Sequence, residues 1–174
     1  MSAAGEGEDL SLAARLGLAL AARHWKVATA ESCTGGLIAA AITDVAGSSA
    51  WFDRGFVTYS NEAKVEMLGV RVETLAAHGA VSEAIAREMA SGALARSGAD
   101  LAIAVTGVAG PYGGSADKPV GMVCLAWAQR DRAIESATRL FPGDRADVRQ
   151  ATVSAALTGL LERDWAGGDP GTTG

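Results

Sequence analysis

The sequence predicts an α/β protein, in the form of a three-layer α/β/α sandwich on a mixed sheet of about five strands. Three observations lead to this prediction. Short apolar runs typical of strands alternate with longer runs of helical period, which favours helices on both faces of a sheet. Residues 100–106 are almost continuously apolar, as in a strand that is buried on both faces. Residues 122–128 and 133–141 resemble strands and are joined by four residues, which predicts an antiparallel hairpin.

Helical spacing and strand-like composition divide the chain into elements. Leucines at positions 12, 16 and 20 recur at the helical period, and residues 51–60 are rich in aromatic and β-branched side chains. The expected helices are 12–23, 37–44, 61–68, 72–78, 83–96 and 145–165, and the expected strands are 27–30, 51–60, 100–106, 122–128 and 133–141. Asn61, Ser82 and Asp144 are the expected N-caps, because their side chains accept hydrogen bonds from helix amides.

Composition and charge limit the class of protein. The 174 residues are 49% hydrophobic and 20% charged, which is typical of one globular domain with a full core. The net charge of -5 argues against a nucleic-acid or anionic-membrane binder. The apolar stretch 10–22 is too short to span a bilayer, and nothing resembles a signal peptide. We expect a cytoplasmic protein with its domain at 10–165 and disordered tails at 1–9 and 166–174.

A polar turn follows the first expected strand. Glu31, Ser32, Cys33 and Thr34 crowd the strand end, and two glycines, 35 and 36, precede an apolar helix. Two interpretations fit this pattern equally well. The helix N-terminus can attract a phosphate, a carboxylate or a developing oxyanion, with glycines that admit a ligand closely. Alternatively, the stretch is an ordinary strand-to-helix turn with a Thr34 cap.

Other polar groups follow the other expected strands. Tyr59 lies at the end of one, and Thr106 begins the glycine-rich loop 107–121. Ligands of α/β sheets bind outside the carboxyl ends of the strands, and loops of this length in compact domains tend to be functional. The loop matches neither the phosphate-loop pattern nor the dinucleotide-binding pattern. We therefore expect Ser32, Tyr59 and Thr106 to share one site.

Elimination narrows the chemistry of such a site. The two histidines, 24 and 78, lie at helix ends and form no metal-ligand pattern, so neither a Ser-His-Asp triad nor a zinc site is expected, and we expect no cofactor. Lys64 is the remaining candidate base, either neutral and desolvated beside a serine, with Tyr59 as proton relay, or simply solvated. Cys33 is a rival nucleophile without a histidine nearby. Arg145 and Arg149 lie one turn apart, as a solvated face or as a fork for phosphate.

Several segments resemble the CinA C-terminal domain family. The residues that carry the likeness are T-A-E-S-C-T-G-G at 29–36, D-V-A-G-S-S-A-W-F at 44–52, V-T-Y-S-N-E-A-K at 57–64, H-G-A-V-S at 78–82, T-G-V-A-G-P-Y-G-G-S at 106–115, K-P-V-G at 118–121 and F-P-G-D-R at 141–145. They occur in order between about residues 10 and 163. The resemblance implies an anticodon-binding-domain-like sandwich. It also implies a stand-alone nicotinamide-nucleotide amidohydrolase, which converts nicotinamide mononucleotide (NMN) to nicotinic acid mononucleotide and ammonia in pyridine nucleotide salvage.

The resemblance also implies roles at matching positions. Ser49, Lys64 and Tyr59 would be nucleophile, base and relay, with Ser32 as the competing choice for nucleophile. Ser32, Thr34, Gly35 and Gly36 would hold the oxyanion or substrate, and Thr106, Gly107, Gly110 and Arg145 would bind the nucleotide. Residues 112 and 115–117 lie in the loop's variable part and leave details of the substrate rim open. A homodimer is expected, with no nucleic-acid or membrane partner.

Two other classes of function stay open. One is a catalytically silent nucleotide-binding or interaction module linked to competence or DNA damage. The other is an amidase for a different substrate, for which Arg145 is the discriminating residue.

Overall fold

A five-stranded mixed sheet forms the centre of the molecule, as predicted. The computed structural model describes residues 10–165, so the predicted tails at 1–9 and 166–174 lie outside the described residues. The strands are β1 (Val27–Glu31), β2 (Phe52–Val57), β3 (Leu101–Gly107), β4 (Met122–Gln129) and β5 (Glu135–Leu140), in the order β2-β1-β3-β4-β5. β1 pairs in parallel with β2 and β3, whereas β4 is antiparallel to both β3 and β5. The carboxyl ends of β1, β2 and β3 therefore share one edge.

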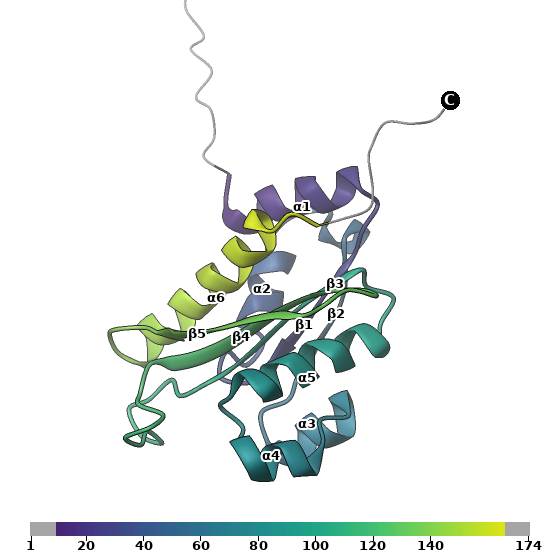
Figure 1. Cartoon of the computed structure of the whole chain (residues 1–174). Helices are drawn as coiled ribbons and strands as arrows, with labels where there is room; N and C mark the ends of the chain where they lie inside the picture. The colour runs from purple at the N-terminus through teal and green to yellow at the C-terminus, as the bar shows by residue number, and fades with distance from the viewer. Residues whose placement is uncertain (1–9, 166–174) are drawn as a thin grey trace, which may run out of the picture.

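Helices cover both faces of this sheet (Figure 1). One face carries α1 (Leu12–Ala22), α2 (Leu37–Thr43) and α6 (Arg145–Glu162), and the other carries α3 (Asn61–Leu68), α4 (Val72–His78) and α5 (Glu83–Ala95). In the part of the chain that the structure describes, no helix combines the length and the apolar character that crossing a membrane requires. The three-layer sandwich is confirmed.

The two faces of the sheet differ in side-chain size because strand residues alternate between faces. The large residues Leu101, Ile103 and Val105 belong to the core under α1, α2 and α6. Their neighbours Ala102 and Ala104 belong to the core under α5, which is rich in alanine. Small side chains let α5 lie close to the sheet, and α5 makes extensive contact with β3 and β4. The alternation explains why residues 101–105 are all apolar.

Several expected boundaries shift by a few residues. β2 ends at Val57 rather than at residue 60, because Ser60 caps α3 by accepting a hydrogen bond from the Ala63 amide. The expected cap, Asn61, is instead the first residue of α3. The caps Ser82 and Asp144 are confirmed, and α6 ends at Glu162 instead of residue 165.

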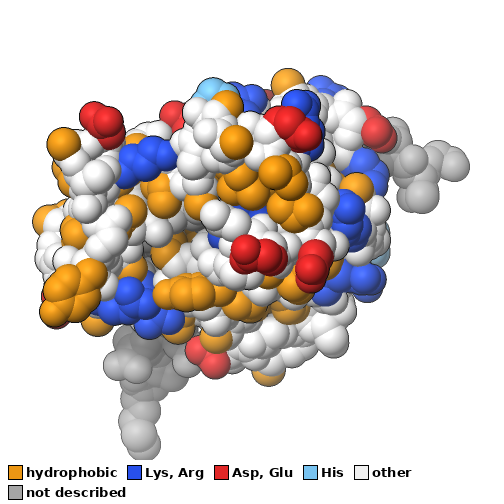
Figure 2. Space-filling view, turned by 90° about the horizontal axis from the view of Figure 1, so that it is seen from below, with side chains coloured by type: hydrophobic (Ala, Val, Ile, Leu, Met, Phe, Trp, Pro, Cys, Tyr) orange, Lys and Arg blue, Asp and Glu red, His pale blue; other side chains and the backbone are white. Residues whose placement is uncertain are grey.

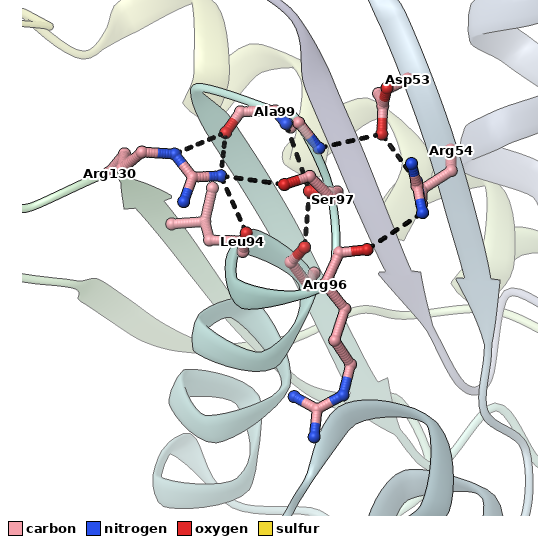
Figure 3. Close-up of polar contacts among 9 residues, drawn as sticks. Asp53, Arg54, Leu94, Arg96, Ser97, Ala99 and Arg130 are labelled. Carbon is pink, nitrogen blue, oxygen red and sulfur yellow. Dashed lines mark hydrogen bonds and ion pairs between the residues drawn. The ribbon is translucent and has the colours of Figure 1, made fainter.

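Arginines bind the carbonyl groups at the C-terminal end of α5, on the edge opposite the strand carboxyl ends (Figure 3). Arg130 donates to the carbonyl oxygens of Leu94, Ser97 and Ala99 at 2.8, 3.2 and 2.6 Å. Arg54 donates to the Arg96 carbonyl and also pairs with a neighbouring carboxylate. Cations suit the negative end of a helix dipole. These arginines therefore have a structural role, at the edge of the sheet opposite the carboxyl ends of β1, β2 and β3.

Candidate active site

A cavity of about 290 Å³ lies at the carboxyl ends of β1, β2 and β3. Figure 2 views the molecule from the side of α3 and α4 and shows a surface hollowed near its centre, with Lys and Arg side chains beside the hollow. The cavity is lined by residues from all three strand ends and from the N-terminus of α6. The predicted site residues among them are Ser32, Tyr59, Lys64, Thr106, Gly107, Gly110 and Arg145.

Ser32 and Lys64 form the polar centre of this cavity. Lys64 Nζ lies 3.0 Å from Ser32 Oγ and 2.8 Å from the Thr58 carbonyl oxygen. The lysine is 1% exposed. Among residues 10–165, ion pairs join Arg54 to Asp53, Arg71 to Glu73 and Arg163 to Glu135, so no carboxylate there compensates Lys64.

Burial lowers the pKa of Lys64 from its ordinary value of 10.5, because the apolar surroundings disfavour the ammonium form. The lysine also lies in the first turn of α3, where the helix dipole is positive and further disfavours a cation. A neutral amine at this position can accept the proton of the Ser32 hydroxyl group. Of the two interpretations of Lys64, the structure supports the desolvated base.

Glu31 fixes the turn that carries Ser32. Its buried carboxylate accepts hydrogen bonds from the backbone amides of Ile38 and Ala39 at 2.9 and 3.0 Å, and from the hydroxyl of Thr34 at 2.7 Å. The amide donors at the N-terminus of α2 are therefore occupied from inside the protein. The expectation that they bind a substrate anion is wrong.

The predicted substrate-binding roles of Thr34, Gly35 and Gly36 need the same correction. Thr34 is fully buried, with its side chain on Glu31, and none of the three residues lines the cavity. Gly36 occupies the cap position of α2 with φ of 103° and no side-chain cap, which excludes a Thr34 cap. A left-handed backbone of this kind favours glycine. Their contribution is to shape the turn.

Replacing Glu31 by Gln should lower the free energy of unfolding by about 2–3 kcal/mol, because a charge-assisted acceptor of helix amides is lost and a buried donor group is added. Urea denaturation followed by circular dichroism measures the change. The matched control is Glu66→Gln, at an exposed position of α3, where we expect a change below about 0.5 kcal/mol. Equal effects for the two variants would contradict the role of Glu31.

Tyr59 and Arg145 meet at the rim. Arg145 Nη1 donates to the Gly110 carbonyl at 2.8 Å, and its Nη2 lies 3.3 Å from the Tyr59 hydroxyl. The Tyr59 side chain is largely exposed, and only its backbone carbonyl approaches Lys64, at 3.5 Å. In this structure the phenol contacts neither Ser32 nor Lys64, so the predicted proton relay is corrected to a rim residue. Thr106 is buried and donates to the Ala80 carbonyl at 2.8 Å, which ties β3 to the cavity wall.

Ser49 lies at the other edge of the sheet. It belongs to the short helix η1 (Ser48–Ala50), which precedes β2, whereas Lys64 follows β2. The six residues of β2, at about 3.3 Å each, separate the two by about 20 Å. The prediction of Ser49 as nucleophile to Lys64 is therefore wrong for a site within one chain. The serine that contacts the lysine is Ser32.

Cys33 does not qualify as the nucleophile. It lines the cavity, but burial raises the pKa of its thiol to about 11. A thiol with that pKa is protonated at neutral pH and is a poor nucleophile.

Two features of the site escaped the sequence reasoning. The Thr58 carbonyl orients Lys64, and Arg149 binds the carbonyls of Cys33 and Thr34. Both act through backbone groups, which every residue carries, so residue type gave no signal. Ala80 and Val81 also line the cavity, and only their place in the H-G-A-V-S segment pointed to them.

The fold and the site define an α/β protein with a buried serine–lysine pair at the carboxyl edge of a mixed sheet. The chain belongs to the CinA C-terminal domain family, whose model matches residues 9–163, which confirms the resemblance. The nicotinamide-nucleotide amidohydrolase PncC of Enterobacter agglomerans is 58% identical over 87% of this chain and 93% of its own length. The protein of that name from Escherichia coli K12 is 53% identical over 91% of this chain and 96% of its own.

Solved structures agree with this assignment. The competence/damage inducible protein CihA of Agrobacterium tumefaciens is 54% identical, with a TM-score of 0.84 over 86% of this chain and 92% of its own. The competence damage-inducible protein A of Klebsiella pneumoniae is 50% identical, also with a TM-score of 0.84, over 87% of this chain and 94% of its own.

Proposed function

We propose that the protein hydrolyses the carboxamide of NMN to give nicotinic acid mononucleotide and ammonia. The prediction of an enzyme, a hydrolase, agrees with the relatives named nicotinamide-nucleotide amidohydrolase PncC. The observation that carries the mechanism is the 3.0 Å contact between Ser32 Oγ and the buried amine of Lys64. It supplies a nucleophile and a base without a histidine.

The proposed reaction has two stages. Neutral Lys64 accepts the Ser32 proton while Oγ attacks the carboxamide carbon, which gives a tetrahedral intermediate. The resulting ammonium of Lys64 then returns the proton to the leaving amine, the C–N bond breaks, and ammonia departs. Water, deprotonated by the same amine, then attacks the carbonyl carbon of the acyl-Ser32 ester. The bond to Ser32 Oγ breaks, the ammonium of Lys64 returns the proton to Oγ, and nicotinic acid mononucleotide departs. The base is thus regenerated in each stage.

Backbone amides can stabilise the oxyanion of both intermediates. Within residues 10–165, the N–H group of Cys33 donates to no other residue, and Cys33 directly follows Ser32 and lines the cavity. Donors that follow the nucleophile in this way suit an oxyanion hole. We therefore propose that the turn after Ser32, and not the amides of α2, holds the oxyanion.

Charge at the rim favours an anionic substrate. Arg145 binds the Gly110 carbonyl oxygen and the Tyr59 hydroxyl group, and has no carboxylate partner among the ion pairs of the described residues. An uncompensated guanidinium at the mouth of a cavity attracts a phosphate group and binds it in a bidentate manner. We assign the 5′-phosphate of the nucleotide to Arg145.

The variant Arg145→Gln should raise the KM for NMN by roughly 10–100-fold, with a smaller effect on kcat, because a charge-assisted contact to phosphate is lost. Nicotinamide riboside, which lacks the phosphate, should show a raised KM with wild type and no further rise with the variant. Steady-state ammonia release measures both substrates. Arg163→Gln, at the C-cap of the same helix and paired with Glu135, is the control. Equal KM values for riboside and nucleotide with wild type would exclude the phosphate contact.

The remaining parts of the proposal concern the context of the activity. We propose a role in pyridine nucleotide salvage, a single domain over 10–165 and a homodimer, for which light scattering is the test. A catalytically silent module is the second candidate, and the desolvated Lys64 beside Ser32 argues against it. Turnover of NMN by wild type decides between the two.

A further inference from the structure

Arg149 binds the turn that follows Ser32 through two hydrogen bonds to backbone carbonyls. From α6, its Nε donates to the Cys33 carbonyl and its Nη2 to the Thr34 carbonyl, both at 3.2 Å. The guanidinium also passes over Gly35, where an added Cβ would lie 3.5 Å from Nη2. One planar side chain from a distant helix thus fixes two successive peptide groups. Arg149 does not line the Ser32 cavity, and its contacts are not those of a phosphate fork.

The geometry of the peptide groups in this turn determines the direction of a hydrogen-bond donor beside Ser32. In a planar trans peptide the carbonyl and the N–H point in opposite directions. The Ser32 carbonyl and the Cys33 N–H belong to one peptide, and this carbonyl accepts a hydrogen bond from the Gly35 N–H, so the Cys33 N–H points away from Gly35. The Cys33 N–H donates to no other residue within 10–165, and Cys33 lines the cavity.

The second peptide that Arg149 binds, between Thr34 and Gly35, closes the turn that begins at Ser32. The Thr34 carbonyl belongs to the same peptide as the Gly35 N–H, which donates to the Ser32 carbonyl at 3.0 Å. Holding this peptide therefore also holds the backbone of Ser32, whose hydroxyl must remain 3.0 Å from Lys64. Glu31 holds the same turn from the side of α2. The turn is thus restrained through both its carbonyls and its side chains.

We propose that Arg149 is a positioning residue for amide hydrolysis, which holds the turn after Ser32 so that the N–H of Cys33, a residue of the cavity wall, meets the developing oxyanion. This inference rests on the proposed function. Because the oxyanion exists only in the transition state and the intermediates, the contribution of Arg149 appears in kcat and not in substrate binding. A phosphate-binding arginine would show the opposite pattern.

The test compares Arg149→Met and Arg149→Lys with wild type in steady-state ammonia release from NMN. Arg149→Met should lower kcat by roughly 10–100-fold, below the full loss of an oxyanion donor, with KM within about threefold of wild type. The kcat of Arg149→Lys should lie between those of wild type and Arg149→Met, because an ammonium group does not reproduce the bidentate contact of the guanidinium with two carbonyls. The control is Arg163→Met, which removes the C-cap arginine of α6, a side chain that also donates to a carbonyl, that of Gly159, and should leave kcat unchanged. Thermal unfolding checks that each variant is folded.

Hydrogen–deuterium exchange supplies a readout that does not depend on turnover. Amides at 33–36 should exchange at least roughly fivefold faster in Arg149→Met than in wild type, while those of β4 stay unchanged. An unchanged kcat, or a rise in KM for NMN that is absent for nicotinamide riboside, would overturn the positioning role. Wild type that releases no ammonia would overturn the proposed function instead. Unchanged amide exchange at 33–36 in Arg149→Met would show that Arg149 does not restrain the turn, whatever the activity of wild type.

Discussion

Replacing Ser32 by Ala is expected to lower kcat for ammonia release from NMN by roughly 10⁴–10⁶-fold, because the reaction loses its nucleophile. Ser32 is the serine whose hydroxyl lies 3.0 Å from the buried amine of Lys64. Removal of one oxygen from a small side chain leaves the turn and the helix caps intact, so the variant should fold. Coupled measurement of ammonia at saturating substrate gives the rate, and circular dichroism checks the fold.

The control for this experiment is Ser49→Ala. Ser49 is exposed and lies beyond the amino end of β2, so its loss should leave kcat within about twofold of wild type. A folded but inactive Ser49→Ala beside an active Ser32→Ala would reverse the assignment of the nucleophile. It would also require the serine of a second copy of the chain, since within one chain β2 separates Ser49 from Lys64.

Replacing Lys64 by Met is expected to lower kcat by roughly 10³–10⁴-fold, because the general base and the proton donor for the leaving amine are lost together. Methionine keeps most of the apolar stem of this buried side chain of α3, so folding should persist. Since Ser32 and Lys64 act as a unit, the double variant should be little slower than either single variant. Additive losses would contradict a shared proton transfer.

The lowered pKa of Lys64 also gives the sign of two pH effects. Activity requires the neutral amine, so kcat/KM of wild type should rise with pH through the folded-state pKa, which lies below 10.5. Between that pKa and the ordinary value, the unfolded chain binds more protons than the folded one. The unfolding free energy of wild type relative to Lys64→Met should therefore rise as pH increases across this window and level off near 10.5. A difference that falls with pH would contradict the desolvated lysine.

Much of the fold followed from local patterns. The alternation of strand and helix, the continuously apolar run of β3 and the hairpin of β4 and β5 are set by near neighbours in the chain, which periodicity detects. The common edge for Ser32, Tyr59 and Thr106 followed from the parallel strands. Boundaries shifted where one residue served two elements, as Ser60 does when it ends β2 and caps α3.

The site was harder to predict because distance in sequence is a poor guide to distance across a sheet. Ser49 and Lys64 lie in adjacent motifs, yet the whole length of β2 runs between them, whereas Ser32 reaches Lys64 from the neighbouring strand. Glu31 looked like part of a catalytic turn but binds the amides of its own following helix. Arg149 looked like a phosphate ligand, and its partners are carbonyls from a segment over a hundred residues away.

The most direct test of the central claim is the stoichiometry of ammonia and nicotinic acid mononucleotide released from NMN by wild type, Ser32→Ala and Ser49→Ala in one assay. We expect equal amounts of the two products from wild type and from Ser49→Ala, and no detectable release from folded Ser32→Ala. Full turnover by Ser32→Ala, or no ammonia from wild type, would contradict the account.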